Sequence, residues 1–196
     1  MLAIINYNAG NIQSVQFAME RIGAAYVLTD QPEIIKKADK VIFPGVGEAA
    51  STMQYLQATN LDLLIKELKQ PVLGICLGMQ LLCDSSEEGN TSCLGIIPQK
   101  VCKFRARNQE KVPHVGWNTF QSTPHPNRLF DKVDKDSYVY YVHSYYVEEG
   151  PYTIASSDYI LPFTAALQKD NYYATQFHPE KSGTVGEQIL KNFLAL

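Results

Sequence analysis

The feature that most constrains this chain is a cysteine set between two glycines directly after an apolar run. The run at residues 71–75 has the length of a buried strand, and Gly74, Cys76 and Gly78 match the pattern glycine-x-nucleophile-x-glycine. Glycines at these positions leave room for a strained backbone and a closely packed helix. The pattern predicts a sharp strand-to-helix turn that exposes Cys76 at the carboxyl edge of a sheet. The alternative is a structural cysteine buried as a small apolar residue.

Strands and helices alternate through the first half of the chain. Apolar runs predict strands at residues 2–5, 25–28, 41–43 and 71–75. Helical spacing predicts a helix from an N-cap at Asn11 to a stop at Gly23, and further helices at 32–37, 48–56, 61–68 and after Cys76. Such alternation implies a parallel sheet that binds ligands at the carboxyl ends of its strands. We therefore expect the turns at Asn6 and Gly45 to meet the Cys76 turn at one edge.

The second half of the chain changes character. β-Branched and aromatic runs predict strands at 100–104, 117–120, 138–142, 152–155, 164–167 and 172–177. Residues 169–171 indicate a hairpin turn, and residues 184–187 form a capping-box pattern before a final helix. We expect an α/β fold with a central, mostly parallel sheet flanked by helices and additional antiparallel strands in the C-terminal half. Residues 1–196 show no linker or repeat and are expected to form a single domain.

Composition excludes several classes of function. The 196 residues carry a formal net charge of -3, which gives no overall attraction to nucleic acid. No apolar stretch approaches the roughly 18–20 residues of a membrane span, and the first residues lack a basic leader, so we expect a cytoplasmic protein with no membrane partner.

The four cysteines lack the spacing of a zinc site and are expected to be reduced. The basic stretch at 100–111 is either a solvated strand edge or part of a partner surface.

Cys76 requires a base, and the chain offers four histidines: His114, His125, His143 and His178. His178 is favoured because it follows the strand at 172–177 and precedes Pro179, which holds it extended. Residues two apart in extended chain point to the same side, so Glu180 can fix the His178 tautomer. We predict a triad of Cys76, His178 and Glu180 that cleaves an amide through a thioester. The alternative for residues 178–180 is a surface turn.

Thiolate attack on a carbonyl also needs hydrogen-bond donors for the developing oxyanion, and loss of one donor in a protease costs about 3 to 4 kcal/mol. The backbone N–H of Leu77 directly follows the nucleophile. The Pro-Gly-Val-Gly turn at residues 44–47 is flexible enough to present the N–H of Val46. We expect these two amides to form the oxyanion hole. On pattern alone, the glycine turn is equally typical of an ordinary strand-to-helix connection.

These motifs resemble a known family. Residues 74–80 (Gly-Ile-Cys-Leu-Gly-Met-Gln) and 178–182 (His-Pro-Glu-Lys-Ser) are similar to the two signatures of class I glutamine amidotransferases, whose fold is flavodoxin-like. The resemblance spans essentially the whole chain. It implies that Cys76 attacks the side-chain amide of glutamine, that His178 moves the proton, and that Glu180 orients His178. Ammonia and glutamate would be the products, with no cofactor and no metal.

The resemblance also implies how glutamine is held. Gly47, Gln80, Glu88 and Ser144 match positions that bind the substrate in the family. The alternative for Gln80 is a solvent-facing helix residue, and the alternative for Glu88 is a residue of a charged loop.

Further motifs are similar to those of the family members that supply ammonia to a cyclase subunit of (βα)8 barrel fold: Gly10-Asn11 and residues 44–47, 113–118 and 143–145. That cyclase makes imidazole glycerol phosphate and aminoimidazole carboxamide ribotide in histidine biosynthesis, so the resemblance implies a heterodimer. Tyr138 and Lys181 resemble positions that face the barrel. Asn6 and Gln99 depart from the usual aspartate and glycine of the family, which leaves the predicted triad untouched.

Two rival interpretations remain. Another class I glutaminase, such as the subunit of a pyridoxal phosphate or anthranilate synthase, would use the same triad. Met79 and Val46 argue against it, because other members more often carry histidine and glycine there. A partner-binding or thiol-sensing module on a flavodoxin-like fold would need no triad, since fold alone does not specify function.

Overall fold

The computed structural model describes residues 1–7, 12–107, 110–122, 126–134 and 136–196. Its largest sheet has eight strands, which are parallel to one another from β2 to β14 and antiparallel beyond β14. In spatial order these strands are β2 (Tyr26–Thr29), β1 (Leu2–Ile5), β3 (Lys40–Phe43), β4 (Val72–Ile75), β14 (Tyr172–Thr175), β13 (Leu161–Lys169), β12 (Thr153–Tyr159) and β9 (Gln121–Ser122). The expected combination of parallel and antiparallel strands is confirmed.

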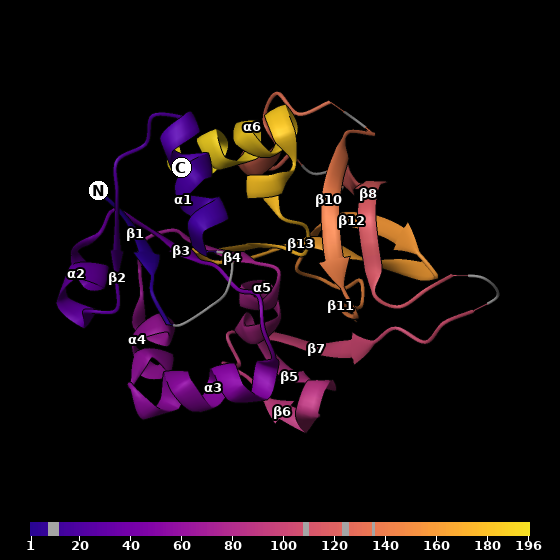
Figure 1. The fold of residues 1–196 in the computed structure, drawn as a ribbon, viewed down its shortest axis with the longest axis horizontal. Coiled ribbons are helices and arrows are strands. Elements are labelled where there is room, and N and C mark those ends of the chain that lie inside the picture. Colours follow the sequence, from indigo (N-terminus) through magenta and orange to yellow (C-terminus); the bar gives the residue numbers. More distant parts are fainter. Residues whose placement is uncertain (8–11, 108–109, 123–125, 135) are drawn as a thin grey trace.

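Helices cover both faces of the parallel part of this sheet (Figure 1). One face carries α1 (Ile12–Arg21) and α6 (Gly183–Leu194); the other carries α2 (Pro32–Lys37), α3 (Ala49–Ala58), α4 (Leu61–Glu67) and α5 (Leu77–Leu82). Successive strand residues alternate between the two layers: Ile4 and Ile42 pack with α1 and α6, whereas Ile5 and Phe43 pack with α3, α4 and α5. This period of two is the pattern of strands buried on both faces.

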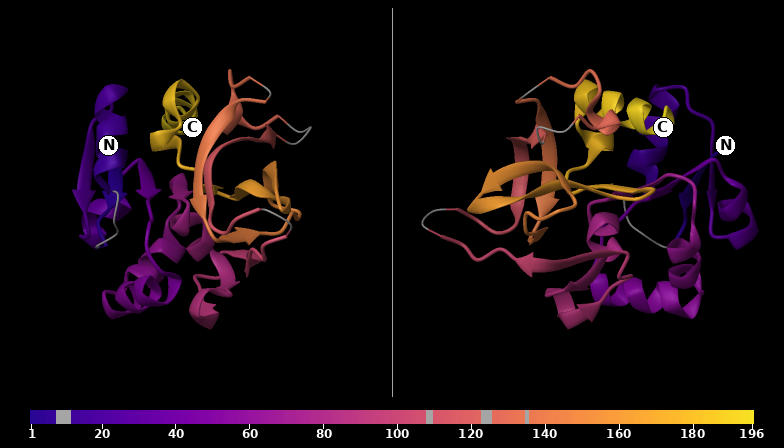
Figure 2. Two further views of the ribbon diagram at one scale, coloured as in Figure 1. Left: turned by 45° about the vertical axis from the view of Figure 1, so that its right-hand side comes forward. Right: turned by 180° about the vertical axis from the view of Figure 1, so that it is seen from behind.

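Two smaller sheets extend the C-terminal half beyond the central layer, as the two views of Figure 2 show. One consists of β8 (His114–Thr119) and β10 (Tyr138–His143), and the other of β11 (Tyr145–Val147), β7 (Ile97–Lys103), β5 (Cys83–Ser86) and β6 (Thr91–Ser92). Three short 3-10 helices complete the described elements: η1 (Glu88–Asn90), η2 (Arg128–Phe130) and η3 (Pro179–Lys181). None of the helices in the described residues is long and apolar enough to cross a membrane.

The expected hairpin at residues 169–171 is present, because Lys169 pairs with Tyr172 and Asp170 adopts a φ of 52°. The prediction of a capping box that starts at Thr184 is wrong. Helix α6 begins at Gly183, so Thr184 lies inside the first turn, and the N-cap residue Ser182 makes no capping hydrogen bond with its side chain. The sequence does not predict the short strands β5, β6, β9 and β11, which contain two to four residues. The expected N-cap Asn11 lies outside the described residues.

Candidate active site

Cys76 stands on a strained turn between β4 and α5. Its backbone has a φ of 51° and a ψ of -105°, a conformation that non-glycine residues rarely adopt. The Cys76 N–H donates to the Thr175 carbonyl (2.8 Å), and the Cys76 carbonyl accepts from the Gln80 N–H (3.2 Å). A Cβ atom at Gly78 would collide with the Phe43 carbonyl oxygen, so this close approach requires glycine. The expected strand-to-helix turn is therefore present.

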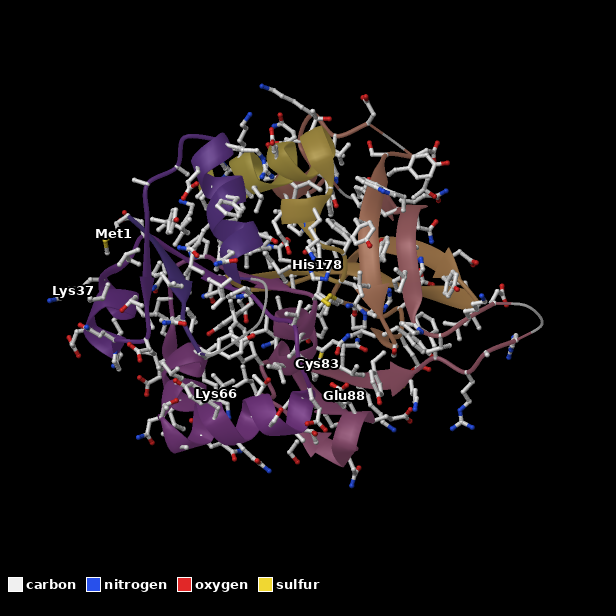
Figure 3. All side chains as sticks on the ribbon, in the orientation of Figure 1. Met1, Lys37, Lys66, Cys83, Glu88 and His178 are labelled. Atoms are coloured by element: carbon white, nitrogen blue, oxygen red, sulfur yellow. The ribbon has the colours of Figure 1, made fainter. Side chains whose placement is uncertain are left out.

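His178 and Glu180 form a buried hydrogen-bonded pair beside the cysteine. The Nδ1 atom of His178 lies 2.8 Å from Oε1 of Glu180, and the two residues are only 1% and 5% exposed. Burial alone would lower the pKa of His178, but the charge of Cys76 and the hydrogen bonds to Cys76 and Glu180 raise it to about 10. The surface-turn alternative is excluded, because both side chains point into the molecule. In Figure 3, His178 lies near the centre of the fold.

The predicted contact between His178 and Glu180 is present, but the reasoning that led to it is only half right. His178 is extended, with a φ of -97° and a ψ of 95°, as Pro179 requires. Glu180 is not extended; it belongs to η3, whose turn brings the carboxylate back toward the ring. The Ser182 hydroxyl donates to the His178 carbonyl (2.7 Å) and accepts from the Tyr140 N–H (3.0 Å). These bonds attach the segment to β10.

A cavity of about 320 Å³ opens beside Cys76 and brings most of the predicted site residues together. Of those residues, its lining includes Val46, Gly47, Cys76, Leu77, Gln80, Glu88, Ser144, His178 and Lys181. Glu180 stands behind His178 rather than in the lining. Tyr138 lies on β10 with 60% of its surface exposed and does not contribute to the cavity. The turns after Gly45 and at Cys76 thus meet at this cavity as expected, whereas no described residue of the turn at Asn6 belongs to its lining.

The two predicted oxyanion donors are not both available. The Leu77 N–H donates to the Gly45 carbonyl at 3.3 Å, so this amide is occupied by the chain itself. Val46 lines the cavity, and the hydroxyl of Tyr7 donates to the Pro44 carbonyl at the start of the same turn. Turning the peptide between Gly45 and Val46 would release the Leu77 N–H and direct the Val46 N–H inward. In this structure the predicted pair of donors is therefore not assembled.

Gln80 and Glu88 are more constrained than ordinary surface residues. Gln80 is 4% exposed, and its Nε2 donates to the Tyr145 carbonyl (3.1 Å) and to Oε1 of Gln176 (3.0 Å). Its own Oε1 is therefore the atom that it can offer to a ligand. Glu88 accepts from the Ala49 N–H at the start of α3 (2.8 Å), and burial raises the pKa of its carboxyl group. Figure 3 shows Glu88 beside α3.

Two of the other candidate bases contact each other instead of Cys76. His143 Nδ1 lies 2.7 Å from the Tyr145 carbonyl, which can only accept, so Nδ1 carries the hydrogen. His114 Nδ1 lies 3.1 Å from His143 Nε2 and therefore donates to it. Burial lowers the pKa of His114 to about 4 and that of His143 to about 3. His125 lies outside the described residues.

Sequence reasoning overlooked two polar groups beside the sulfur atom. The Gln176 Nε2 donates to Cys76 Sγ at 3.6 Å, and the Cys76 thiol donates to the Val142 carbonyl at 3.7 Å. Gln176 directly follows β14, and residues 176 and 177 form a bend, so a simple alternation of side chains does not predict its position. The Val142 carbonyl carries no signal either, since any residue supplies a carbonyl.

Family comparison agrees with this geometry. The sequence matches the family described as "Glutamine amidotransferase class-I" over residues 3–196, so the chain belongs to that family. Among curated relatives, it is 58% identical to "Imidazole glycerol phosphate synthase subunit HisH" of Bacteroides fragilis (strain YCH46), over 100% of this chain and 99% of the relative. Proteins of the same name from Bacteroides thetaiotaomicron and Idiomarina loihiensis are 56% and 49% identical, over 100% of this chain and 99% and 97% of their own.

Solved structures support the fold. A glutamine amidotransferase crystal structure superposes with a TM-score of 0.75 at 15% identity, over 98% of this chain and 97% of that chain. A glutamine amidotransferase from Thermotoga maritima gives a TM-score of 0.65 at 18% identity, over 99% and 80%.

Proposed function

We propose that this chain, acting as one domain, hydrolyses glutamine and supplies the ammonia for imidazole glycerol phosphate synthesis in histidine biosynthesis. The observation that carries this proposal is the convergence of Cys76 and the buried His178–Glu180 pair on one cavity. A non-catalytic module would have no need for a carboxylate that raises the pKa of a histidine beside a thiol. Full-length similarity to HisH subunits favours this pathway over those of other class I glutaminases.

The reaction uses the two buried groups in turn. The Cys76 thiolate attacks the side-chain carbonyl carbon of glutamine, and the tetrahedral intermediate collapses as His178 gives a proton to the departing ammonia. Water, deprotonated by His178, then attacks the thioester and releases glutamate. Glu180 holds His178 through the 2.8 Å contact and stabilises its imidazolium form.

The remaining cavity residues suit the polar ends of glutamine. The Glu88 carboxylate can accept from the α-ammonium group, and Gln80 Oε1 can accept from the amide nitrogen. Gly47 and Ser144 also line this cavity, and the Ser144 carbonyl already accepts from the Phe104 N–H (3.0 Å). Lys181 lies on its rim, next to Glu180.

The occupied Leu77 amide predicts that the chain alone is a slow glutaminase. As long as the Gly45 carbonyl accepts from Leu77 at 3.3 Å, a tetrahedral oxyanion lacks both of its expected donors. Loss of a single donor slows comparable reactions by about 10²- to 10³-fold. A bound partner would activate the enzyme by favouring the turned Gly45–Val46 peptide. Vigorous turnover by the chain without a partner would contradict this step.

The decisive test of the function is Cys76→Ala in the complex with a cyclase subunit. We expect glutamine-dependent synthesis of imidazole glycerol phosphate to be abolished, because no thiolate remains. Synthesis from added ammonium salt should continue at the unsubstituted rate, because only the ammonia supply needs Cys76. Product formation with each nitrogen source is the measurement. Loss of both activities, or retention of the glutamine-dependent one, would reject the assignment.

We further propose that a cyclase subunit of (βα)8 barrel fold docks on the outer face of the β8–β10 sheet. This face exposes Val115, Trp117, Tyr138 and Val142, each between 38% and 60% accessible. Such a group of exposed apolar side chains is typical of an interaction surface. It also adjoins the cavity, because Val142 belongs to both. Ammonia released beside Cys76 would therefore leave close to the partner.

The docking face can be tested with Trp117→Glu. A charge at this position should weaken binding of the cyclase subunit at least about ten-fold, since buried tryptophans are frequent hot spots. Phe17→Glu is the matched control, because Phe17 is 57% exposed on α1, away from this sheet. Calorimetric titration of each variant with the cyclase gives the affinity. Equal affinities for the two variants would place the partner elsewhere.

A further inference from the structure

Gln176 lies fully buried beside the reacting sulfur, and the mechanism above gives it no role. It follows β14 and is 0% exposed. A buried amide needs partners for both its oxygen and its nitrogen. The Gln176 Oε1 accepts from Gln80 Nε2 at 3.0 Å, and its Nε2 donates to Cys76 Sγ at 3.6 Å. Gln176 therefore connects a predicted substrate-binding residue to the predicted nucleophile.

The orientation of the Gln176 amide is fixed by its neighbours. Gln80 Nε2 also contacts the Tyr145 carbonyl at 3.1 Å, and a carbonyl only accepts, so the nitrogen of Gln80 must face it. The same nitrogen then presents an N–H to Gln176, whose partner atom must be the oxygen. A reversed Gln176 amide would set two N–H groups against each other. The Gln176 N–H must consequently point at Sγ.

Besides His178, which hydrogen-bonds to Cys76, two polar groups beside the sulfur favour opposite forms of it. The Val142 carbonyl accepts from the thiol at 3.7 Å, so this contact stabilises the protonated sulfur only. The Gln176 N–H donates to sulfur at 3.6 Å, and such a bond strengthens when the acceptor becomes an anion. Removal of the proton thus abolishes the first contact and reinforces the second.

We infer that Gln176 is a further catalytic residue, which stabilises the Cys76 thiolate and directs it toward the cavity. This inference rests on the proposed glutamine hydrolysis. A merely structural role would consist of holding Gln80, whose amide shares the network. The two roles differ in their consequence: the first changes the reactivity of sulfur itself, whereas the second changes only how substrate is bound.

Alkylation of Cys76 in the full-length chain separates these roles. Iodoacetamide is neutral and reacts with the thiolate, and mass spectrometry of the Cys76 peptide distinguishes it from the other three free cysteines. For Gln176→Leu we expect the rate at pH 7 to fall about ten-fold, the effect of losing one charge-assisted hydrogen bond. The rate at the alkaline limit should not fall, because all of the sulfur is then ionised and a thiolate without this hydrogen bond is no weaker as a nucleophile.

A role limited to holding Gln80 would survive any substitution that keeps an oxygen in the place of Gln176 Oε1. Gln176→Glu retains the shape and the oxygen for Gln80 but replaces the donor with an acceptor, and it should slow alkylation at least as much as Gln176→Leu. This variant decides the matter if the leucine variant does not fold. Gln168→Leu is the matched control, because Gln168 bonds to Asn127 (2.5 Å) away from the cavity.

An unchanged profile for both Gln176 variants would overturn the inference, and so would an unchanged profile for Gln176→Glu alone, because that variant keeps the oxygen that Gln80 contacts. Failure of the proposed function is a separate result. It would show as glutamine-dependent synthesis that survives Cys76→Ala, whatever the alkylation rates.

Discussion

Two pairs of buried side chains lie beside the same cavity, and both contain histidine. The histidine of one pair is charged, whereas the histidines of the other pair are neutral. In the His178–Glu180 pair, burial would lower the pKa of the imidazole, but Cys76 and then the Glu180 carboxylate raise it to about 10. In the His114–His143 pair, burial lowers the pKa values to about 4 and about 3, and the partner is another imidazole. Burial is common to both pairs. The partner therefore decides whether a buried histidine carries a proton.

The neutral pair has a positional role. His143 holds the Tyr145 carbonyl at 2.7 Å, which is the same oxygen that Gln80 contacts. His114 is stacked between the rings of Tyr141 and Tyr159, with centroid distances of 4.8 Å and 4.0 Å. A proton on either imidazole would place a charge among these rings and disturb the chain of hydrogen bonds. The His178–Glu180 pair is thus suited to proton transfer, whereas the His114–His143 pair is suited to remaining neutral.

The largest effect is expected when the charged pair is made neutral by Glu180→Gln. The amide no longer stabilises an imidazolium, so the pKa of His178 should fall and glutamine hydrolysis in the complex should slow by about 10²-fold or more. Steady-state glutamate release is the measurement. Glu187→Gln is the matched control, because Glu187 pairs with Arg21 at the surface (3.0 Å) and should leave the rate unchanged. A Glu180→Gln enzyme of normal activity would remove the distinction between the two pairs.

An intermediate effect is expected from the neutral pair at acid pH. The folded pKa values of about 3 and about 4 lie below the ordinary 6.5, so the folded state binds fewer protons than the unfolded state. This contribution to stability is complete above about pH 6.5 and is lost as pH falls below it, by about 2 kcal/mol per histidine at pH 5. His178, with a raised pKa, has the opposite sign: its contribution is complete below pH 6.5 and is lost as pH rises through about 10.

Urea unfolding of His143→Gln at pH 7, 6 and 5 isolates this contribution. We expect the variant to be less stable than the unsubstituted chain at pH 7 but to lose less stability between pH 7 and pH 5. Carboxyl groups that titrate in this range are common to both proteins and cancel in the difference. Parallel stability profiles would mean that His143 is not held neutral.

The smallest effect is expected from Ser182→Ala, which loosens the support of the charged pair without changing its chemistry. It removes the bonds to the His178 carbonyl and the Tyr140 N–H, so the free energy of unfolding should fall by about 1 to 2 kcal/mol. Activity should fall only a few-fold, since His178 and Glu180 remain. Ser51→Ala is the control, because Ser51 bonds to Glu48 at an exposed helix start (3.3 Å). If both variants unfold alike, the Ser182 bonds contribute nothing measurable.

The parts of the site that the sequence predicts are those set by neighbouring residues. Gly74 and Gly78 restrict the turn at Cys76, and Pro179 restricts the backbone of His178, so these features are visible in short motifs. The Gln176–Gln80 and His114–His143 contacts depend instead on strands that meet across long separations. The predicted capping box at Thr184 is absent because α6 already begins at Gly183, and the hydroxyl of its N-cap residue Ser182 donates to the His178 carbonyl. Tertiary partners outside the motif decided these cases.

The parallel ladder between β4 and β14 pairs Ile75 with Thr175 and so sets the cysteine beside the segment that carries Gln176 and His178. Because side chains alternate along extended chain, one inserted or deleted residue between the hairpin at 169–171 and His178 would turn both side chains to the opposite face. Natural variants of this chain should therefore tolerate substitutions in that segment far better than changes in its length. Substitutions in this segment are compatible with the site, whereas insertions and deletions are not.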